Sequence, residues 1–174
     1  MAGPTFTIII PTCGRPTLAD TVASVTPQLG DGDELHLIRR DNAPWGHATR
    51  NHAMPHAAGS HLLFIDDDDR YLPDALTLIR IKLTPTTRHR VHLFSMRYDN
   101  GHLVQPRWPL EVGYVSTQMM CVPNSPDLLG VWGDRYEGDY DFIATTMLLR
   151  GDEPVLHADV IAQIGRPSHA RAAA

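Results

Sequence analysis

The sequence predicts a single-domain α/β protein with a mainly parallel central sheet, helices on both faces of that sheet and a mixed-sheet C-terminal half. Short apolar runs rich in β-branched residues alternate with segments of helical periodicity through the first 97 residues, an order typical of parallel sheets. Each of these runs stops at a cluster of polar residues. A chain of 174 residues with 43% hydrophobic content is long enough for one core but not for two.

Three strands are predicted in the first half of the chain. They cover residues 5–10, which Pro11 ends, residues 34–38 and residues 61–65. In open α/β sheets the ligand lies beyond the carboxyl ends of the strands. We therefore expect the polar clusters that follow these strands to converge at one edge of the sheet. These clusters are residues 12–15, 40–42 and 66–69.

Three helices are predicted to connect and follow these strands. Thr17 can cap the first helix, which Pro27 ends. The second is predicted over residues 46–58, where Pro55 should kink or shorten it. The third is predicted over residues 73–83, with a proline at its first position.

The second half of the chain is less regular. Strands are predicted over residues 91–97 and near residues 118–122, and a helix is predicted over residues 140–150. Residues 99–108 contain a glycine and a proline and suit either a hairpin or a flexible loop. We expect the domain to span residues 1–165, and residues 166–174 to form a flexible tail.

Composition limits the classes of function. The formal net charge of −5 argues against a general attraction to the nucleic-acid backbone. Only two cysteines are present, which fits a reducing compartment better than a disulfide scaffold. No apolar run approaches the ~20 residues needed to cross a bilayer, and the first five residues lack the features of a secretory signal. We therefore expect a cytoplasmic protein with no membrane span.

Four consecutive aspartates, Asp66 to Asp69, follow the third predicted strand directly. Neighbouring carboxylates repel one another by about 4 kcal/mol per close pair at an effective dielectric constant near 20, so a folded protein needs a reason to collect them. If the chain stays extended there, Asp66 and Asp68 point to one side and Asp67 and Asp69 to the other. Such oxygen ligands suit Mg²⁺ or Mn²⁺, with water and a diphosphate completing the coordination.

The acidic run has two other interpretations. The run can be a solvated acidic turn that caps the following helix, which is the commoner role of such runs. The apolar strand before it favours the ligand-binding edge of the sheet instead. A calcium loop of the EF-hand type does not fit, because Tyr71 stands where the tight-turn glycine belongs and Thr77 where the bidentate glutamate belongs.

Four motifs, in order, resemble family two of the inverting glycosyltransferases, which have the fold called GT-A. Residues 9–16 read IIPTCGRP and resemble that family's opening strand and loop. Residues 46–51 (GHATRN) resemble its "G.a.ARN" segment, and residues 58–69 (AGSHLLFIDDDD) resemble "A.GeyilFlDdDD". Residues 138–142 (GDYDF) resemble the later "ED.DL" segment. The resemblance covers roughly residues 5–150, and the order makes it more specific than any single motif.

The resemblance implies a donor site in the first half, residues 5–97, and an acceptor side in residues 98–165. The donor would be a UDP-, GDP- or TDP-sugar. Asp41 would meet the base, Arg50 would help to hold the donor, and Asp66 would touch the ribose or the metal. Asp68 would be the main ligand of a Mn²⁺ or Mg²⁺ ion, and His157 is a candidate further ligand. The full implied set of donor residues is Pro11, Thr12, Arg15, Asp41, Arg50, Asp66 and Asp67.

On the acceptor side the resemblance makes Asp139 the general base, which takes a proton from an acceptor hydroxyl as that oxygen attacks the anomeric carbon with inversion. Asp141 is a rival for this role, and either aspartate can instead be a helix cap. Trp132 is a candidate for stacking on an acceptor sugar, or else a core residue.

The sequence departs from the family at two places. Residues 39–44 read RRDNAP where the family usually has "VDDGS", and Gly138 replaces the usual glutamate of the base motif.

The sequence leaves two alternative functions open. One is a nucleotide-sugar binding module without catalysis, and the other is a sugar-phosphate nucleotidyltransferase, which needs more glycine in the first loop. The acceptor class is open, and a homodimer is a possible partner arrangement.

Overall fold

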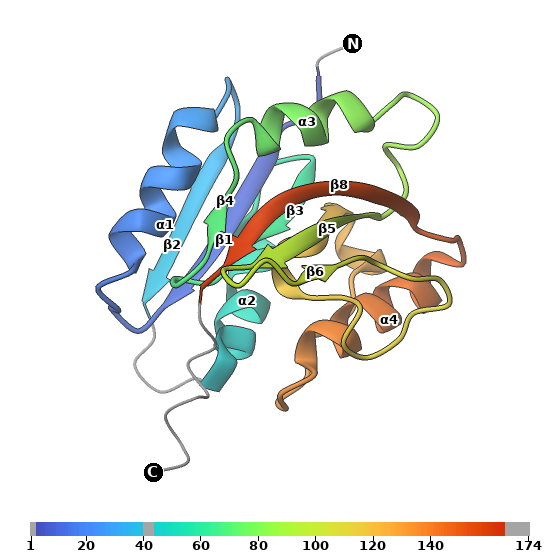
Figure 1. The fold of residues 1–174 in the computed structure, drawn as a ribbon. Helices are drawn as coiled ribbons and strands as arrows, with labels where there is room; N and C mark the ends of the chain where they lie inside the picture. Colours follow the sequence, from blue (N-terminus) through green and yellow to red (C-terminus); the bar gives the residue numbers. More distant parts are fainter. Residues whose placement is uncertain (1–2, 40–43, 166–174) are drawn as a thin grey trace.

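The computed structural model describes residues 3–39 and 44–165, which form a mixed α/β structure around one curled sheet (Figure 1). Within these residues the sheet has eight strands in the order β2-β1-β3-β7-β5-β8-β4, with β6 paired to β5. The strands are β1 (Phe6–Thr12), β2 (Glu34–Arg39), β3 (His61–Phe64), β4 (Arg70–Tyr71), β5 (His92–Tyr98), β6 (Leu103–Val104), β7 (Met120–Pro123) and β8 (Val155–Ile164).

Four α-helices accompany the sheet in the described residues. They are α1 (Leu18–Val25), α2 (His47–Ala53), α3 (Ala75–Lys82) and α4 (Gly138–Arg150). Five short 3₁₀ helices add to them, at Thr26–Gln28, Pro44–Gly46, Met54–His56, Thr117–Met119 and Pro126–Leu128. None of the described helices is long and apolar enough to span a membrane.

The three predicted strands and three predicted helices of the first half are present, but β1 continues through Pro11 to Thr12 and the two-residue strand β4 was not predicted. β1 lies between β2 and β3 and pairs in parallel with both, so the carboxyl ends of the three strands share one edge. All seven residues of β1 are buried, as its β-branched sequence predicts. The second helix is shorter than predicted because α2 gives way at Met54 to the 3₁₀ turn that contains Pro55. Thr17 makes no capping hydrogen bond through its side chain.

The sheet as a whole is mixed, whereas the sequence predicted a mainly parallel one. Parallel pairing is confined to β2-β1-β3 and to β5 with β8, while β3-β7, β7-β5, β5-β6 and β4-β8 are antiparallel. The first half supplies three strands for parallel units, but β7 enters between β3 and β5 in the opposite direction. The mixed pairing predicted for the second half of the chain is therefore found in the centre of the sheet as well, where β7 lies between β3 and β5.

β8 was not predicted from the sequence. Its ten residues include His157, Asp159 and Gln163, and half-buried positions outnumber buried ones, so no clear apolar alternation marks it as a strand. It pairs in parallel with β5, with register irregularities near Ser95, and then in antiparallel with β4. The long strand curves across the molecule in Figure 1 and brings its carboxyl end to the edge where β1 also ends.

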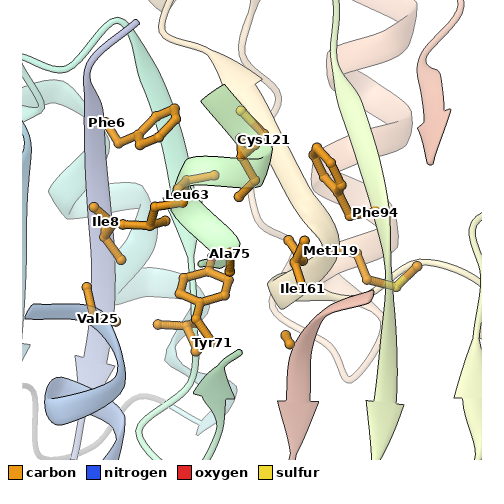
Figure 2. Packing of buried hydrophobic residues seen from close by; sticks show 14 of the residues in the cluster. Phe6, Ile8, Val25, Leu63, Tyr71, Ala75, Phe94, Met119, Cys121 and Ile161 are labelled. Atoms are coloured by element: carbon orange, nitrogen blue, oxygen red, sulfur yellow. The ribbon is translucent and has the colours of Figure 1, made fainter. Parts of the chain in front are cut away.

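Two hydrophobic clusters cover the two faces of the sheet, because alternate residues of a strand point to opposite faces. Ile8 and Ile10 face α1 and α3, together with Leu63 and the buried Tyr71 (Figure 2). Ile9 faces the opposite way, in the cluster that α2 and α4 complete. The expectation of helices on both faces of the sheet is confirmed. This packing fixes the edge at which the functional side chains meet.

Candidate functional site

A cavity of about 330 Å³ lies at the edge where β1 and β3 end. Its wall is built from the end of β1, the aspartate run after β3, the end of β5, residues 112–118 and the beginning of α4. These segments are far apart in sequence, and the strand order brings them together. The cavity occupies the place that the carboxyl ends of parallel strands predict for a ligand.

The four aspartates form a tight turn rather than an extended segment. The backbone N–H of Asp69 donates to the carbonyl of Asp66 at 3.2 Å, which closes the turn. The extended backbone on which the predicted alternation depended is therefore absent, although Asp66 and Asp68 are still more exposed than Asp67 and Asp69. Asp67 and Asp68 face Arg15, and Asp66 and Asp69 share Gln118. We call residues 66–69 the carboxylate turn.

Asp67 joins the carboxylate turn to the loop after β1. Its Oδ2 atom accepts hydrogen bonds from Thr12 Oγ1 at 2.6 Å and from the Cys13 N–H at 3.3 Å. Arg15 Nη1 lies 2.9 Å from Asp67 Oδ1 and 2.9 Å from Asp68 Oδ2. Three of the predicted donor residues, Thr12, Arg15 and Asp67, are thus brought together. With Pro11 they line the cavity.

Gln118 is a site residue that the sequence did not reveal. It is 2% exposed and lies in the 3₁₀ turn just before β7. Its Nε2 atom donates to Asp66 Oδ2 at 3.1 Å and to Asp69 Oδ2. The opposite oxygen of Asp69 accepts from the N–H of Gly165, at the end of β8, at 2.9 Å. A polar residue at the start of an apolar strand was the only signal, and it needs the strand order to be interpreted.

Arg50 supports the carboxylate turn from inside the protein. It is wholly buried, and its Nη2 atom pairs with Asp66. Nη1 donates to the carbonyl of Trp45 at 2.7 Å, and the guanidinium lies 4.7 Å above the Trp132 ring. Arg50 does not line the cavity. The predicted donor residue therefore acts behind the wall, where it orients Asp66, rather than on the cavity surface.

The electrostatics of the carboxylate turn favour a bound cation. Burial, together with Asp66 and Asp67, raises the pKa of Asp68 against the opposing effect of Arg15. Burial and the charges of Asp66 and Asp68 raise the pKa of Asp69 to about 8. Since nearby negative charges disfavour each other's ionised forms, a divalent ion at this turn would relieve both shifts.

The residues present fit a cation that is shared with a ligand. The side chains of Asp66 and Asp68 are 34% and 23% exposed and line the cavity, whereas Asp67 and Asp69 are buried. No group of three or more metal-binding side chains exists in the part of the chain that the structure describes. Carboxylate oxygens from Asp66 and Asp68 can therefore supply only part of a coordination shell. Mg²⁺ commonly takes its remaining ligands from water and phosphate.

Asp139 lines the same cavity, from the first turn of α4. Its Oδ1 atom accepts from the N–H of Tyr140 at 2.7 Å. Burial, reinforced by the charge of Asp66, raises the pKa of Asp139 to about 6, although that hydrogen bond, Arg50 and Ser116 act in the other direction. A carboxylate with a pKa near neutrality is well suited to accept a proton.

Asp141 lies outside the cavity wall. Arg135 Nε donates to its Oδ2 atom at 2.7 Å, and the hydrogen bond and charge of Arg135 lower the pKa of Asp141. The geometry therefore favours Asp139 over Asp141 as the base.

Trp132 does not take the acceptor-side position considered for it. It is 2% exposed and stacks on Phe142 with the ring centroids 4.6 Å apart, so it is a core residue.

His157 is remote from the carboxylate turn. It lies near the start of β8, while Gly165, eight positions later in the sequence, contacts Asp69. At about 3.3 Å per strand residue this separation is roughly 25 Å. His157 instead stacks on Phe94 at 4.4 Å and hydrogen-bonds His92 at 2.9 Å. The prediction that His157 joins the aspartates as a metal ligand is wrong. Asp41, the predicted base-binding residue, lies outside the described residues.

Comparisons with known proteins show the fold. No protein-family model matches the chain, and no curated protein matches it. Solved structures of TarS from S. aureus do match. The 1–349 fragment gives a TM-score of 0.71 at 16% identity, covering 94% of this chain and 61% of that one. Its complex with UDP-GlcNAc gives 0.72 at 15%, covering 94% and 59%. Its complex with UDP gives 0.65 at 14%, covering 92% and 60%.

The chain thus spans about three fifths of each of these TarS structures. Identities this low support a shared fold, and function has to be argued from the site. Two of the matched structures hold a nucleotide or a nucleotide sugar.

Proposed function

We propose that this chain transfers a sugar from a nucleoside-diphosphate sugar to an acceptor hydroxyl. The observation that carries the proposal is that the carboxylate turn and Asp139 line one cavity. The carboxylate turn suits a cation and a diphosphate, and Asp139 suits the role of proton acceptor. The shared fold with TarS, which binds UDP-GlcNAc, supports this choice of donor class.

In the proposed reaction the acceptor oxygen attacks the anomeric carbon of the donor sugar. The C–O bond to the diphosphate breaks, and the nucleoside diphosphate leaves with the bonding electrons. Asp139 takes the proton of the attacking hydroxyl, so the carboxylate becomes a carboxylic acid. A single displacement of this kind inverts the configuration at the anomeric carbon.

The protein contributes charge and orientation on the donor side. Asp66 and Asp68 would hold a Mn²⁺ or Mg²⁺ ion, which when bound neutralises the charge that develops on the leaving diphosphate. Arg50 and Gln118 fix the Asp66 carboxylate, and Arg15 fixes Asp68. This fixed arrangement means that little reorganisation is needed as the bond breaks.

A sugar-phosphate nucleotidyltransferase is less well supported. Residues 12–16 contain a single glycine, Gly14, whose N–H donates to Thr12 Oγ1 at 2.9 Å. A glycine-rich loop that cradles a triphosphate needs several such N–H groups turned toward the ligand.

The test begins with binding. Thermal unfolding would be measured with UDP-GlcNAc and with UDP-, GDP- and TDP-hexoses, with and without Mn²⁺, because a ligand of the native state raises Tm by mass action. We expect one donor to raise Tm only when Mn²⁺ is present.

Turnover of that donor would then be followed as release of the nucleoside diphosphate. Release that stops with a chelator supports transfer. Binding without release in any acceptor mixture, unaltered by Asp139→Asn, would identify a non-catalytic binding module.

A further inference from the structure

Trp45 is held in a strained conformation at the rim of the cavity. Its φ is 58°, in the left-handed region that residues other than glycine seldom adopt, and its side chain is 45% exposed although it is large and apolar. It lines the cavity. Strain of this kind persists only where the surroundings impose it, and such residues cluster at binding and catalytic sites.

The surroundings that impose this conformation can be named. The buried Arg50 donates through Nη1 to the carbonyl of Trp45 at 2.7 Å while its Nη2 pairs with Asp66. The next residue, Gly46, has φ of 71°, and a Cβ atom there would lie 2.7 Å from Pro11 Cγ. One arginine thus ties the position of Trp45 to the carboxylate turn.

Tyr136 also lines the cavity, and its ring packs edge to face against that of Trp45. Their ring centroids are 6.5 Å apart and the rings are nearly perpendicular, at 78°. Tyr136 is 59% exposed, lines the cavity and precedes Asp139 by three residues. We call Trp45 and Tyr136 the aromatic pair. Large exposed aromatic rings at a cavity rim are typical of binding surfaces, since the face of the ring is apolar and its polar end contacts water.

The buried His47 packs against Trp45 of the aromatic pair. It is 4% exposed, its ring centroid lies 6.0 Å from that of Trp45, and its Nδ1 is 2.7 Å from the carbonyl oxygen of Gly133. A Cβ atom at Gly138 would lie 2.2 Å from His47 Nδ1. The absence of a side chain at Gly138, where the resembling family has glutamate, therefore leaves room for this histidine beside the first turn of α4.

We propose that the aromatic pair is a subsite for a sugar ring of the acceptor, so that the acceptor hydroxyl belongs to a pyranose unit. This inference rests on the proposed function. A pyranose has an apolar face of C–H groups, which fits against an aromatic ring, and a rim of hydroxyls. Tyr136 precedes Asp139 by three residues and both line the cavity, so a sugar ring on the pair would place hydroxyls beside the segment that carries the base.

The base of the donor is a weaker candidate for the same rings. Trp45 stands next to the loop after β1, because a Cβ atom at Gly46 would lie 2.7 Å from Pro11 Cγ. Tyr136 belongs to the segment that leads into α4 and to Asp139. A ligand that packs on Tyr136 therefore lies beside the segment that carries the proton acceptor, whereas the predicted donor residues Thr12 and Arg15 contact the carboxylate turn.

Saturation-transfer NMR with the full chain tests the subsite directly. The probes are methyl glucoside, methyl galactoside, methyl mannoside and methyl N-acetylglucosaminide, with sorbitol as an open-chain polyol, all in the presence of the diamagnetic Mg²⁺ and UDP. We expect at least one methyl pyranoside to bind and sorbitol not to bind. Equal binding of sorbitol, or no binding by any pyranoside, would overturn the inference.

Substitutions at Trp45 and Tyr136 test whether the pyranoside binds at the aromatic pair. Trp45→Gly removes the ring while allowing the positive φ, so we expect it to melt no lower than the wild type and to weaken pyranoside binding at least tenfold. Tyr136→Ala should weaken it at least threefold, and Trp45→Phe should retain it within threefold. Trp108→Phe, at an exposed tryptophan that does not line the cavity, is the matched control and should bind normally.

The two proposals fail in different ways. If Trp45→Gly weakens UDP binding and leaves pyranoside binding unchanged, the rings serve the donor base and the inference is overturned. If a donor is turned over but no pyranoside binds, the subsite is wrong and the transferase proposal stands. If pyranosides bind through Trp45 but no nucleotide sugar binds or reacts, the subsite stands and the transferase proposal fails.

Discussion

The carboxylates of the cavity differ in how they are supported. In the carboxylate turn, Asp66 is held by Arg50 and Gln118, and Asp67 by Arg15 and Thr12. Burial raises the pKa of Asp68 and Asp69 in the same turn, and a bound cation would oppose that effect. At the start of α4, Asp139 has burial as the largest influence on its pKa and accepts one short backbone hydrogen bond from Tyr140. Ion pairs and hydrogen bonds fix the orientation of a carboxylate, whereas burial makes it ready to accept a proton.

This difference shows how one cavity can use aspartate side chains for two tasks. A carboxylate that holds a cation must remain charged throughout a reaction, so it needs fixed partners. A carboxylate that takes a proton must change its charge, so fixed cationic partners would oppose it. Substitutions at Asp68, Asp139, Gln118 and His157 test this difference between the two kinds of carboxylate.

Asp68→Asn should have the largest effect. The change keeps the shape of the side chain but removes the charge of a cavity-lining carboxylate, and we expect nucleoside-diphosphate release to fall about 10³-fold or more, in line with the loss of metal-assisted charge stabilisation. Asp31→Asn, at an exposed position away from the cavity, is the control. Retention of normal rates by Asp68→Asn would remove the donor-side role of the carboxylate turn.

Asp139→Asn should reduce turnover by about 10²- to 10⁴-fold while leaving the binding of donor and Mn²⁺ intact. Because the base acts when ionised and its pKa is about 6, kcat/KM of the wild type should rise with pH up to about 6 and then level off. The residual activity of Asp139→Asn should lack this dependence. An unchanged acid limb in the variant would assign it to another group.

Asp139 also has a stability signature. Its folded-state pKa is raised from 3.8 to about 6, so between these values the folded protein binds more protons than the unfolded chain, and stability falls as pH rises through this window. Above pH 6 the full penalty is present. Asp139→Asn should then be more stable than the wild type at pH 7.5, by up to about 3 kcal/mol, and urea unfolding at pH 4 and pH 7.5 measures the difference.

Gln118→Leu should destabilise the protein by about 1–3 kcal/mol in the presence of a chelator, because Asp66 and Asp69 lose a shared buried donor. Mn²⁺ with UDP should recover part of this loss, since a cation offsets the repulsion that the amide no longer moderates. Urea unfolding measures both values. Gln163→Ala, which loses a surface hydrogen bond to Asp99, is the control. A neutral Gln118→Leu would show that the amide does not organise the carboxylate turn.

His157→Ala should have the smallest effect on the site. The residue packs against His92 and Phe94, eight residues along the chain from the contact of Gly165 with Asp69, so the affinity for Mn²⁺, measured by calorimetry with UDP present, should stay within about twofold of the wild type. A tenfold weakening would restore His157 as a ligand and would require a different course for β8.

Much of the donor side could be predicted because its determinants are local in sequence. An apolar strand that runs directly into four aspartates places those aspartates at the end of β3 whatever the rest of the chain does. The same reasoning located the loop after β1. The sequence did not predict the partners of each carboxylate, because residues 66–69 form a turn closed by the Asp69 N–H and not the extended strand in which successive side chains alternate.

The residues that were missed depend on contacts between distant segments. Gln118 reaches the carboxylate turn only because β7 inserts beside β3, and β8 carries too many polar residues to be recognised by its periodicity. Trp45 gave no signal, since a strained backbone is set by Arg50 and by the approach of Pro11 to Gly46. Trp132 was considered for a sugar contact because aromatic rings serve cores and binding sites alike, and its burial decides for the core.

The central claim is that the carboxylate turn holds a cation that also contacts a diphosphate. Anomalous scattering from crystals soaked with Mn²⁺ and UDP tests it most directly. We predict one manganese peak within about 2.0–2.3 Å of carboxylate oxygens of Asp66 or Asp68, with diphosphate oxygens on its other side. A bound UDP with no manganese peak at residues 66–69, or a peak elsewhere in the cavity, would contradict the claim.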